Sequence, residues 1–191
     1  SLLDVDRIVV TGPSHTDAAD LVAAAGVAPG DALVDLDTGA AARRVAALPW
    51  IASAEVSRAW GGTVTISVIE RRPLAVLRGA DGAGWLVDAD GVVIDDAASD
   101  PLSPLPVVEG VAPVAPGQVL DPVPTRLLQL VAAAPDDVWA QVEAVEVDAD
   151  GQTWMRLRAR PGELDAEGEP RTDGGRIRLG GHTGPGPLPR S

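Results

Sequence analysis

The chain has 191 residues, a formal net charge of −13 and no cysteine. This length allows one large domain or two small ones, each with its own core. Without cysteine, thiolate metal sites, disulfides and a cysteine nucleophile are excluded. The few Arg side chains are scattered among many carboxylates, so the chain lacks the clustered cations that a nucleic-acid partner requires.

The composition also constrains the core and the origin of the chain. Apolar residues make up 46% of the chain, but its aromatic residues are five Trp without Tyr or Phe. Aliphatic side chains must therefore fill the core. All basic residues are Arg, a bias typical of a GC-rich genome such as that of an actinobacterium. No run of about 18 apolar residues occurs, so we expect no membrane span here, and any anchor would lie upstream of Ser1.

The pattern of residues 1–77 predicts two helices between strands. Residues 3–12 read as a strand. Ser14, followed three residues later by Asp17, resembles a capping box that starts a helix, and Gly26 is placed to end that helix. Helical spacing of apolar residues predicts a second helix over residues 38–48, capped by Asp37 or Thr38.

Two further strands complete this first unit as β-α-α-β-β. Residues 52–60 and 63–70 alternate in polarity, and Gly61-Gly62 between them predicts a two-residue hairpin turn. Val64, Ile66 and Val68 share one face of the second strand, so we expect the helices to cover this face.

From residue 78 onward the pattern predicts a β-rich domain with one helix, and the fold class is therefore α+β. The helix is expected over residues 124–134, with Leu127, Leu128, Leu130 and Val131 as its apolar stripe. The strands are expected in two hairpins with Asp-Gly turns at residues 85–94 and 142–159, a short strand at 105–110, and a last strand at 176–180 that pairs with 153–159. We interpret residues 161–175 as a long mobile loop and 181–191 as a disordered tail.

Nine short strings, taken in order and spacing, resemble the FtsQ/DivIB family of bacterial cell-division proteins. Those in the first unit are residues 5–12 (VDRIVVTG), 30–37 (GDALVDLD), 48–54 (LPWIASA), 58–60 (RAW), 66–68 (ISV) and 70–73 (ERRP). Those in the second are residues 85–88 (WLVD), 91–93 (GVV) and 105–110 (LPVVEG).

The resemblance implies a POTRA domain over residues 1–77 and the family's β domain over 78–180. It implies a single-pass protein of the cytoplasmic membrane, anchored through a segment outside this sequence, with these domains outside the membrane at the division septum. The implied role is that of a non-enzymatic scaffold between early and late division proteins. Its partners would be proteins of the FtsB/FtsL type and those of septal peptidoglycan synthesis, without a cofactor or small-molecule substrate.

One departure concerns the end of the chain. The family continues past the strand that matches residues 176–180 with a helix and a terminal strand, and residues 181–191 resemble neither. The family's main binding residues therefore cannot be transferred to this chain.

Two alternatives remain at this point: a POTRA-bearing outer-membrane assembly or secretion protein, and a secreted enzyme. The only histidines, His15 and His182, are interpreted as surface residues, since neither has a recognisable catalytic partner string. Asp88 to Gly91 and Asp148 to Gly151 look like fragments of calcium loops. Both lack the distal Glu that such a loop requires, so we interpret them as turns.

The candidate partner-binding residues are those of the last strand, because an edge strand can accept an extended partner segment. They are Arg176, Ile177, Arg178, Leu179 and Gly180. Arg71 and Arg72 are a second candidate patch, with a solvated strand end as the alternative. Arg156 and Arg158 are expected to face Arg176 and Arg178 across the hairpin. Carboxylates of the acidic loop, or an acidic partner, would relieve the repulsion.

Overall fold

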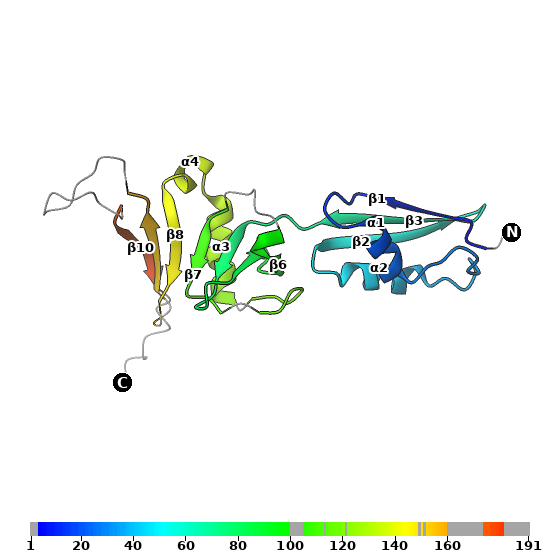
Figure 1. The fold of residues 1–191 in the computed structure, drawn as a ribbon, viewed down its shortest axis with the longest axis horizontal. Helices are drawn as coiled ribbons and strands as arrows, with labels where there is room; N and C mark the ends of the chain where they lie inside the picture. The colour runs from blue at the N-terminus through cyan, green and yellow to red at the C-terminus, as the bar shows by residue number, and fades with distance from the viewer. Residues whose placement is uncertain are drawn as a thin grey trace, which may run out of the picture. The chain divides into compact units, whose positions relative to one another are not determined.

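The computed structural model describes residues 4–99, 105–112, 114–120, 122–148, 150, 152–159 and 174–181. The chain divides into two compact units. One comprises residues 1–72 together with 116–118, and the other residues 73–115 and 119–191. Each unit has its own sheet and its own apolar core. Figure 1 shows the elements of both units.

The first unit has the predicted β-α-α-β-β order. Its elements are β1 (Arg7–Thr11), α1 (Ala18–Ala25), α2 (Thr38–Ala46), β2 (Ile51–Ala59) and β3 (Thr63–Glu70). The sheet order is β1-β3-β2, with β3 in the centre, parallel to β1 and antiparallel to β2. This arrangement confirms the α+β reading of the sequence.

The alternation along β3 determines which face is buried. Val64 and Ile66 are fully buried and Val68 is 6% exposed, whereas Ile69 is 66% exposed. The buried side chains pack with Leu21 of α1 and Val45 of α2. The prediction of a helix-covered face was therefore correct.

Two local predictions in this unit were wrong. The N-cap of α1 is Asp17, whose side chain accepts from the amide of Ala19, whereas the Ser14 hydroxyl donates to Glu70. Ala59 pairs directly with Thr63, so the turn between β2 and β3 has three residues and includes Trp60. The glycines still serve the turn, because both have positive φ angles, 95° at Gly61 and 78° at Gly62.

The second unit holds a mixed seven-stranded sheet of order β10-β9-β8-β7-β4-β5-β6. Its strands are β4 (Ala75–Arg78), β5 (Gly84–Val87), β6 (Val93–Asp96), β7 (Val107–Glu109), β8 (Val142–Val147), β9 (Gln152–Leu157) and β10 (Arg176–Gly181). The three central strands β4, β7 and β8 are parallel, and the other pairs are antiparallel.

The main helix of this unit, α3 (Pro122–Ala133), packs against the sheet through Leu127 and Leu128. It begins two residues earlier than predicted, and a proline is well tolerated at a first helical position because no N–H is needed there. Leu130, expected in the apolar stripe, is 60% exposed, so the stripe is narrower than predicted. A 3-10 turn η1 (Ala97–Ser99) and a one-turn helix α4 (Asp136–Trp139) are additional to the single predicted helix.

Candidate partner-binding site

The last strand, β10, pairs with β9 as predicted. Arg176 lies opposite Arg156, Ile177 opposite Met155, and Arg178 opposite Trp154. A bulge follows, because Gly180 is the next residue in register and Leu179 has no partner opposite it.

Gly174 allows the chain before β10 to approach β9 closely. A Cβ on Gly174 would collide with the carbonyl oxygen of Arg158. The Gly174 amide donates to the Leu157 carbonyl, and the Leu157 amide donates to the Gly175 carbonyl, both at 3.0 Å. The hairpin can therefore close at this point only because a glycine precedes β10.

The two edges of the seven-stranded sheet differ. At one edge, Val92, just before β6, makes a bridge with Val119, and β6 ends in Asp95 and Asp96. At the other edge, no strand of the described residues pairs with the outer side of β10. Charges and covering segments discourage strand addition, so β10 is the more open edge.

One row of side chains shows why β10 is apolar on one face. Leu77, Val108, Val145, Met155 and Ile177 lie opposite one another across β4, β7, β8, β9 and β10. The first three are fully buried, Met155 is half-buried, and Ile177 is 49% exposed. The row of core side chains thus continues to the edge strand β10, where its last member, Ile177, is exposed to solvent. Leu179 beside it is 38% exposed.

The opposite face carries charges. The Arg156 guanidinium lies 3.2 Å from a Glu109 carboxylate oxygen and 3.4 Å from one of Glu143, and it also pairs with Glu146. Arg176 donates to Glu146 at 2.7 Å and lies 4.9 Å from the ring centre of Trp154. Partial burial lowers the pKa of Arg156, but these carboxylates outweigh it and the net pKa is raised.

The ion-pair network shows how the facing arginines are accommodated. Arg156 and Arg176 do face each other, as expected, and the Glu146 carboxylate of β8 pairs with both. Most of the acidic loop, residues 161–173, lies outside the described residues, as does the tail from His182 onward. Arg158 takes another role and donates to the Val142 carbonyl at 3.0 Å.

Sequence reasoning missed Glu109, Glu146 and Trp154. Glu109 and Glu146 are brought together by parallel pairing of distant strands, which no local pattern indicates. A signal existed for Trp154, because it lies two residues before Arg156 on the same strand and therefore shares its face.

Arg71 and Arg72 belong to the first compact unit, unlike the β10 residues. The Arg71 amide donates to the Trp50 carbonyl at 2.8 Å, and Arg71 is half-buried whereas Arg72 is exposed. The two candidate sets therefore lie in different units.

The features that could suggest catalysis or metal binding have structural roles. The ring of His15 stacks on Trp50 at 3.7 Å between ring centres. Asp88 accepts from the amides of Asp90 and Val92, and Asp148 from those of Asp150 and Gln152, as expected of turns. Hydrogen bonds from Gln152 and Trp154 lower the pKa of Asp148. In the described part of the chain, no group of three or more His, Cys, Asp or Glu could hold a metal.

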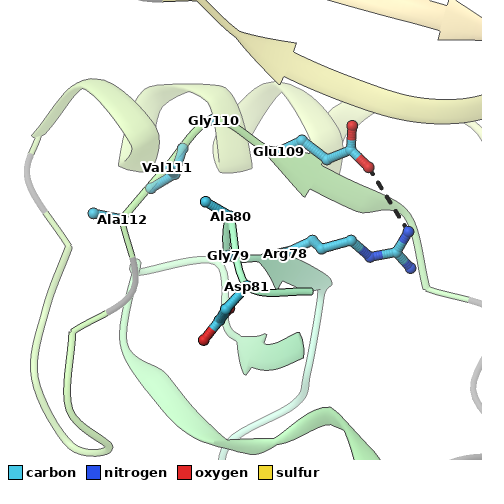
Figure 2. A pocket seen from close by; sticks show the side chains of 8 residues that line it. All are labelled: Arg78, Gly79, Ala80, Asp81, Glu109, Gly110, Val111 and Ala112. Carbon is cyan, nitrogen blue, oxygen red and sulfur yellow. Dashed lines mark ion pairs between the residues drawn. The ribbon is translucent and has the colours of Figure 1, made fainter. Parts of the chain in front are cut away.

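An open hollow of about 650 Å³ lies beyond the ends of β4 and β7 (Figure 2). It is lined by Arg78, Gly79, Ala80, Asp81, Glu109, Gly110, Val111 and Ala112. Arg78 and Glu109 pair at 3.7 Å, and the Asp81 carboxylate accepts from the Ala83 amide at 3.0 Å. The charges of the hollow are thus engaged within the protein.

Two family models cover nearly the whole chain. The model described as "POTRA domain, FtsQ-type" matches residues 3–71, and the model described as "Cell division protein FtsQ/DivIB, C-terminal" matches residues 75–182. The chain belongs to the FtsQ/DivIB family of cell-division proteins.

Curated relatives agree with this assignment. The cell division protein FtsQ of Mycobacteroides abscessus is 37% identical over 145 residues, 75% of this chain and 44% of that protein. FtsQ of Rhodothermus marinus is 33% identical over 160 residues, 82% of this chain and 58% of that protein. FtsQ of Mycolicibacterium smegmatis is 36% identical over 142 residues, 74% of this chain and 40% of that protein.

This FtsQ/DivIB chain spans about half the length of the curated relatives it matches. Neither family description nor any of these names is that of an enzyme. Among the described residues, no helix combines the length and the apolar character needed to cross a membrane.

Proposed function

We propose that this FtsQ/DivIB chain is a non-enzymatic scaffold of the division machinery that binds an extended partner segment along β10. The proposal places the two units outside the cytoplasmic membrane at the septum, held by an anchor upstream of Ser1. The proposed partners are division proteins of the FtsB/FtsL type and, through them, septal peptidoglycan synthesis proteins.

The observation that carries the proposal is the state of β10. Its outer side has no strand partner among the described residues, and Ile177 and Leu179 are 49% and 38% exposed. Backbone N–H and C=O groups on an open edge can be satisfied by an added strand, and alternate side chains then give specificity. A partner strand would extend the apolar row that ends at Ile177 and leave Arg176 and Arg178 on the other face.

Binding of the extracytoplasmic segments of FtsB and FtsL to this chain tests the proposal. Ile177→Glu should weaken binding at least about tenfold, because a charge would replace the apolar contact at the edge. Val119→Glu is the matched control, since Val119 is 61% exposed at the opposite edge of the same sheet. Equal loss of affinity in both variants, or none in either, would contradict the proposed edge.

Hydrogen exchange provides a readout specific for strand addition. The outward-facing amides of β10 should become protected when the partner is bound, because they gain backbone acceptors. Protection confined to α3 or β6, with β10 unchanged, would assign the partner to a different surface.

A further inference from the structure

The turn between β2 and β3 presents a tryptophan to solvent. Trp60 is 92% exposed, more than any other large apolar residue that is exposed in the described part of the chain. A tryptophan has a large apolar ring and one N–H donor, so leaving it in water forgoes a large burial gain. Of the three turn residues, Gly61 and Gly62 supply the positive φ angles, so the backbone does not require a tryptophan at position 60.

The strand through which the chain enters the fold holds this turn in place. The amides of Asp6 and Arg7 both donate to the Gly62 carbonyl, at 2.7 and 3.0 Å. A Cβ on Gly62 would collide with the Asp6 carboxylate, so the turn lies flat against the entering strand. Since β1 runs parallel to β3 and Arg7 lies opposite Thr63, the chain enters at the end of the sheet that carries Trp60.

A second exposed apolar residue is attached to the same end. Val34 is 66% exposed. The Arg58 guanidinium donates to the carbonyls of Leu33, Val34 and Leu36, and Arg58 lies two residues before Trp60. These bonds fix the segment that carries Val34 to the end of β2. Figure 1 shows this loop and the β2–β3 turn at the end of the unit marked N.

The charges at this end are mainly acidic. Asp4, Asp6, Asp31 and Asp35 outnumber Arg7 and Arg58. An anionic surface would not be attracted to this end by charge. Any contact here must come from the apolar side chains, and tryptophan is the residue that most favours the boundary between lipid and water.

We propose that Trp60, with Val34 at the same end of the unit, enters the headgroup region of the bilayer and fixes the first unit against the membrane. The inference rests on the proposed anchor upstream of Ser1, because one or two apolar side chains do not hold a soluble domain on a membrane by themselves. With an anchor nearby, the same contact only has to orient a domain that is already at the surface. The contact is non-electrostatic, so it does not require anionic lipid.

Spin labels on the full-length protein in phosphatidylcholine nanodiscs test this inference. The chain has no cysteine, so Trp60→Cys gives one labelled position in this segment. Ile69→Cys is the control: Ile69 is 66% exposed at the opposite end of β3, about 20 Å from Thr63 by the rise of a strand. We expect the label at position 60 to collide more with oxygen than with a water-soluble nickel chelate, and the label at position 69 to show the reverse order.

Three outcomes would overturn the inference, and they are distinguishable. A label at position 60 that is as accessible to the nickel chelate as the label at position 69 means that the turn faces water. A label shielded from both oxygen and nickel chelate means that a protein covers Trp60 instead of lipid. If the full-length protein does not insert into nanodiscs, both the proposed anchor and the membrane topology given under the proposed function are wrong. Because β10 binding is measured separately, a water-exposed Trp60 leaves that part of the proposed function intact.

Discussion

The carboxylate of Glu70 accepts hydrogen bonds from both the amide and the hydroxyl of Ser14, at 2.9 and 2.7 Å. The amides of His15 and Thr16 donate to the same carboxylate. Glu70 at the end of β3 therefore holds the segment that leads from β1 into α1. This contact joins parts of the chain that are 54 to 56 residues apart.

The Glu70 contact predicts a dependence of stability on pH. The pKa of Glu70 is lowered from 4.5 to about 2, since partial burial raises it but the hydrogen bonds from Thr16 and Ser14 outweigh this effect. A lowered folded-state pKa stabilises the protein above the unfolded-state pKa, and the stabilisation is lost as pH falls from 4.5 towards about 2.

Glu70→Gln should therefore reduce the free energy of unfolding by about 1–2 kcal/mol at pH 7, allowing for solvent screening of a half-buried group. The difference from wild type should shrink as pH falls through 4.5, in thermal unfolding measured from pH 7 to pH 3. Glu55→Gln, on the exposed side of β2, is the control and should change stability by less than about 0.5 kcal/mol. A constant difference between Glu70→Gln and wild type at every pH would contradict the assignment.

Glycines follow β1 and β7 for the same steric reason, which gives a second prediction. A Cβ on Gly12 would collide with the Val68 carbonyl, and one on Gly110 with the Val147 carbonyl. Gly12→Ala and Gly110→Ala should each cost about 3 kcal/mol or more, from steric collision plus positive φ.

Matched controls separate these two contributions to the glycine effect. Gly61 and Gly82 also have positive φ but nothing within 4 Å of an added Cβ. Their Ala variants should cost only about 1 kcal/mol. Chemical denaturation of the four variants measures the difference, and four equal losses would show that φ alone is responsible.

The buried face of β3 gives a third prediction. Ile66→Asp or Val68→Asp should unfold the first unit, because an unpaired carboxylate in the core costs more than about 4 kcal/mol. Ile69→Asp on the same strand should be tolerated, since Ile69 is 66% exposed. Circular dichroism and thermal unfolding distinguish the variants. Normal unfolding of Ile66→Asp would mean that the two faces of β3 are reversed.

The ion-pair network on the second sheet gives a fourth prediction. Glu146 contacts both Arg156 and Arg176, so Glu146→Gln leaves the two arginines facing each other. We expect a loss of about 1 kcal/mol and faster hydrogen exchange in β10, with both effects reduced in high salt.

Glu143→Gln is the control for this network. The Glu143 side chain is 45% exposed, and its carboxylate lies 3.4 Å from Nε of Arg156. It should have less than half the effect of Glu146→Gln. Equal effects would show that general charge, and not the position of Glu146 between the two arginines, matters.

Local patterns in the sequence were sufficient for much of this fold. The alternation of Val64, Ile66 and Val68 predicted β3 with its observed bounds. Successive side chains of a strand point to opposite faces, so a strand that is buried on one face has an apolar residue at every second position. The prediction that α1 ends at Gly26 was correct for a similarly local reason, because the residue after the helix has a φ of 61°, which glycine adopts readily. Among the described strands, β10 lies at the edge of its sheet, as inferred from its place as the last strand.

The errors and omissions arise where a distant residue decides the outcome. Ser14 is a good local cap, but Glu70 competes for its hydroxyl and Asp17 takes its place. Glu109 and Glu146 become neighbours only because β7 and β8 are parallel. Whether the β10 residues bind a partner remains a prediction, since strand geometry does not identify what is added to it.

The position of β10 also has a consequence for biogenesis. Among the described strands, β10 pairs only with β9, and it is the last to leave the ribosome. The other six strands can therefore assemble first. A partially synthesised chain could then have a folded body in which β9 is the open edge, and the partner binding proposed for β10 would become possible only after β10 has paired with β9.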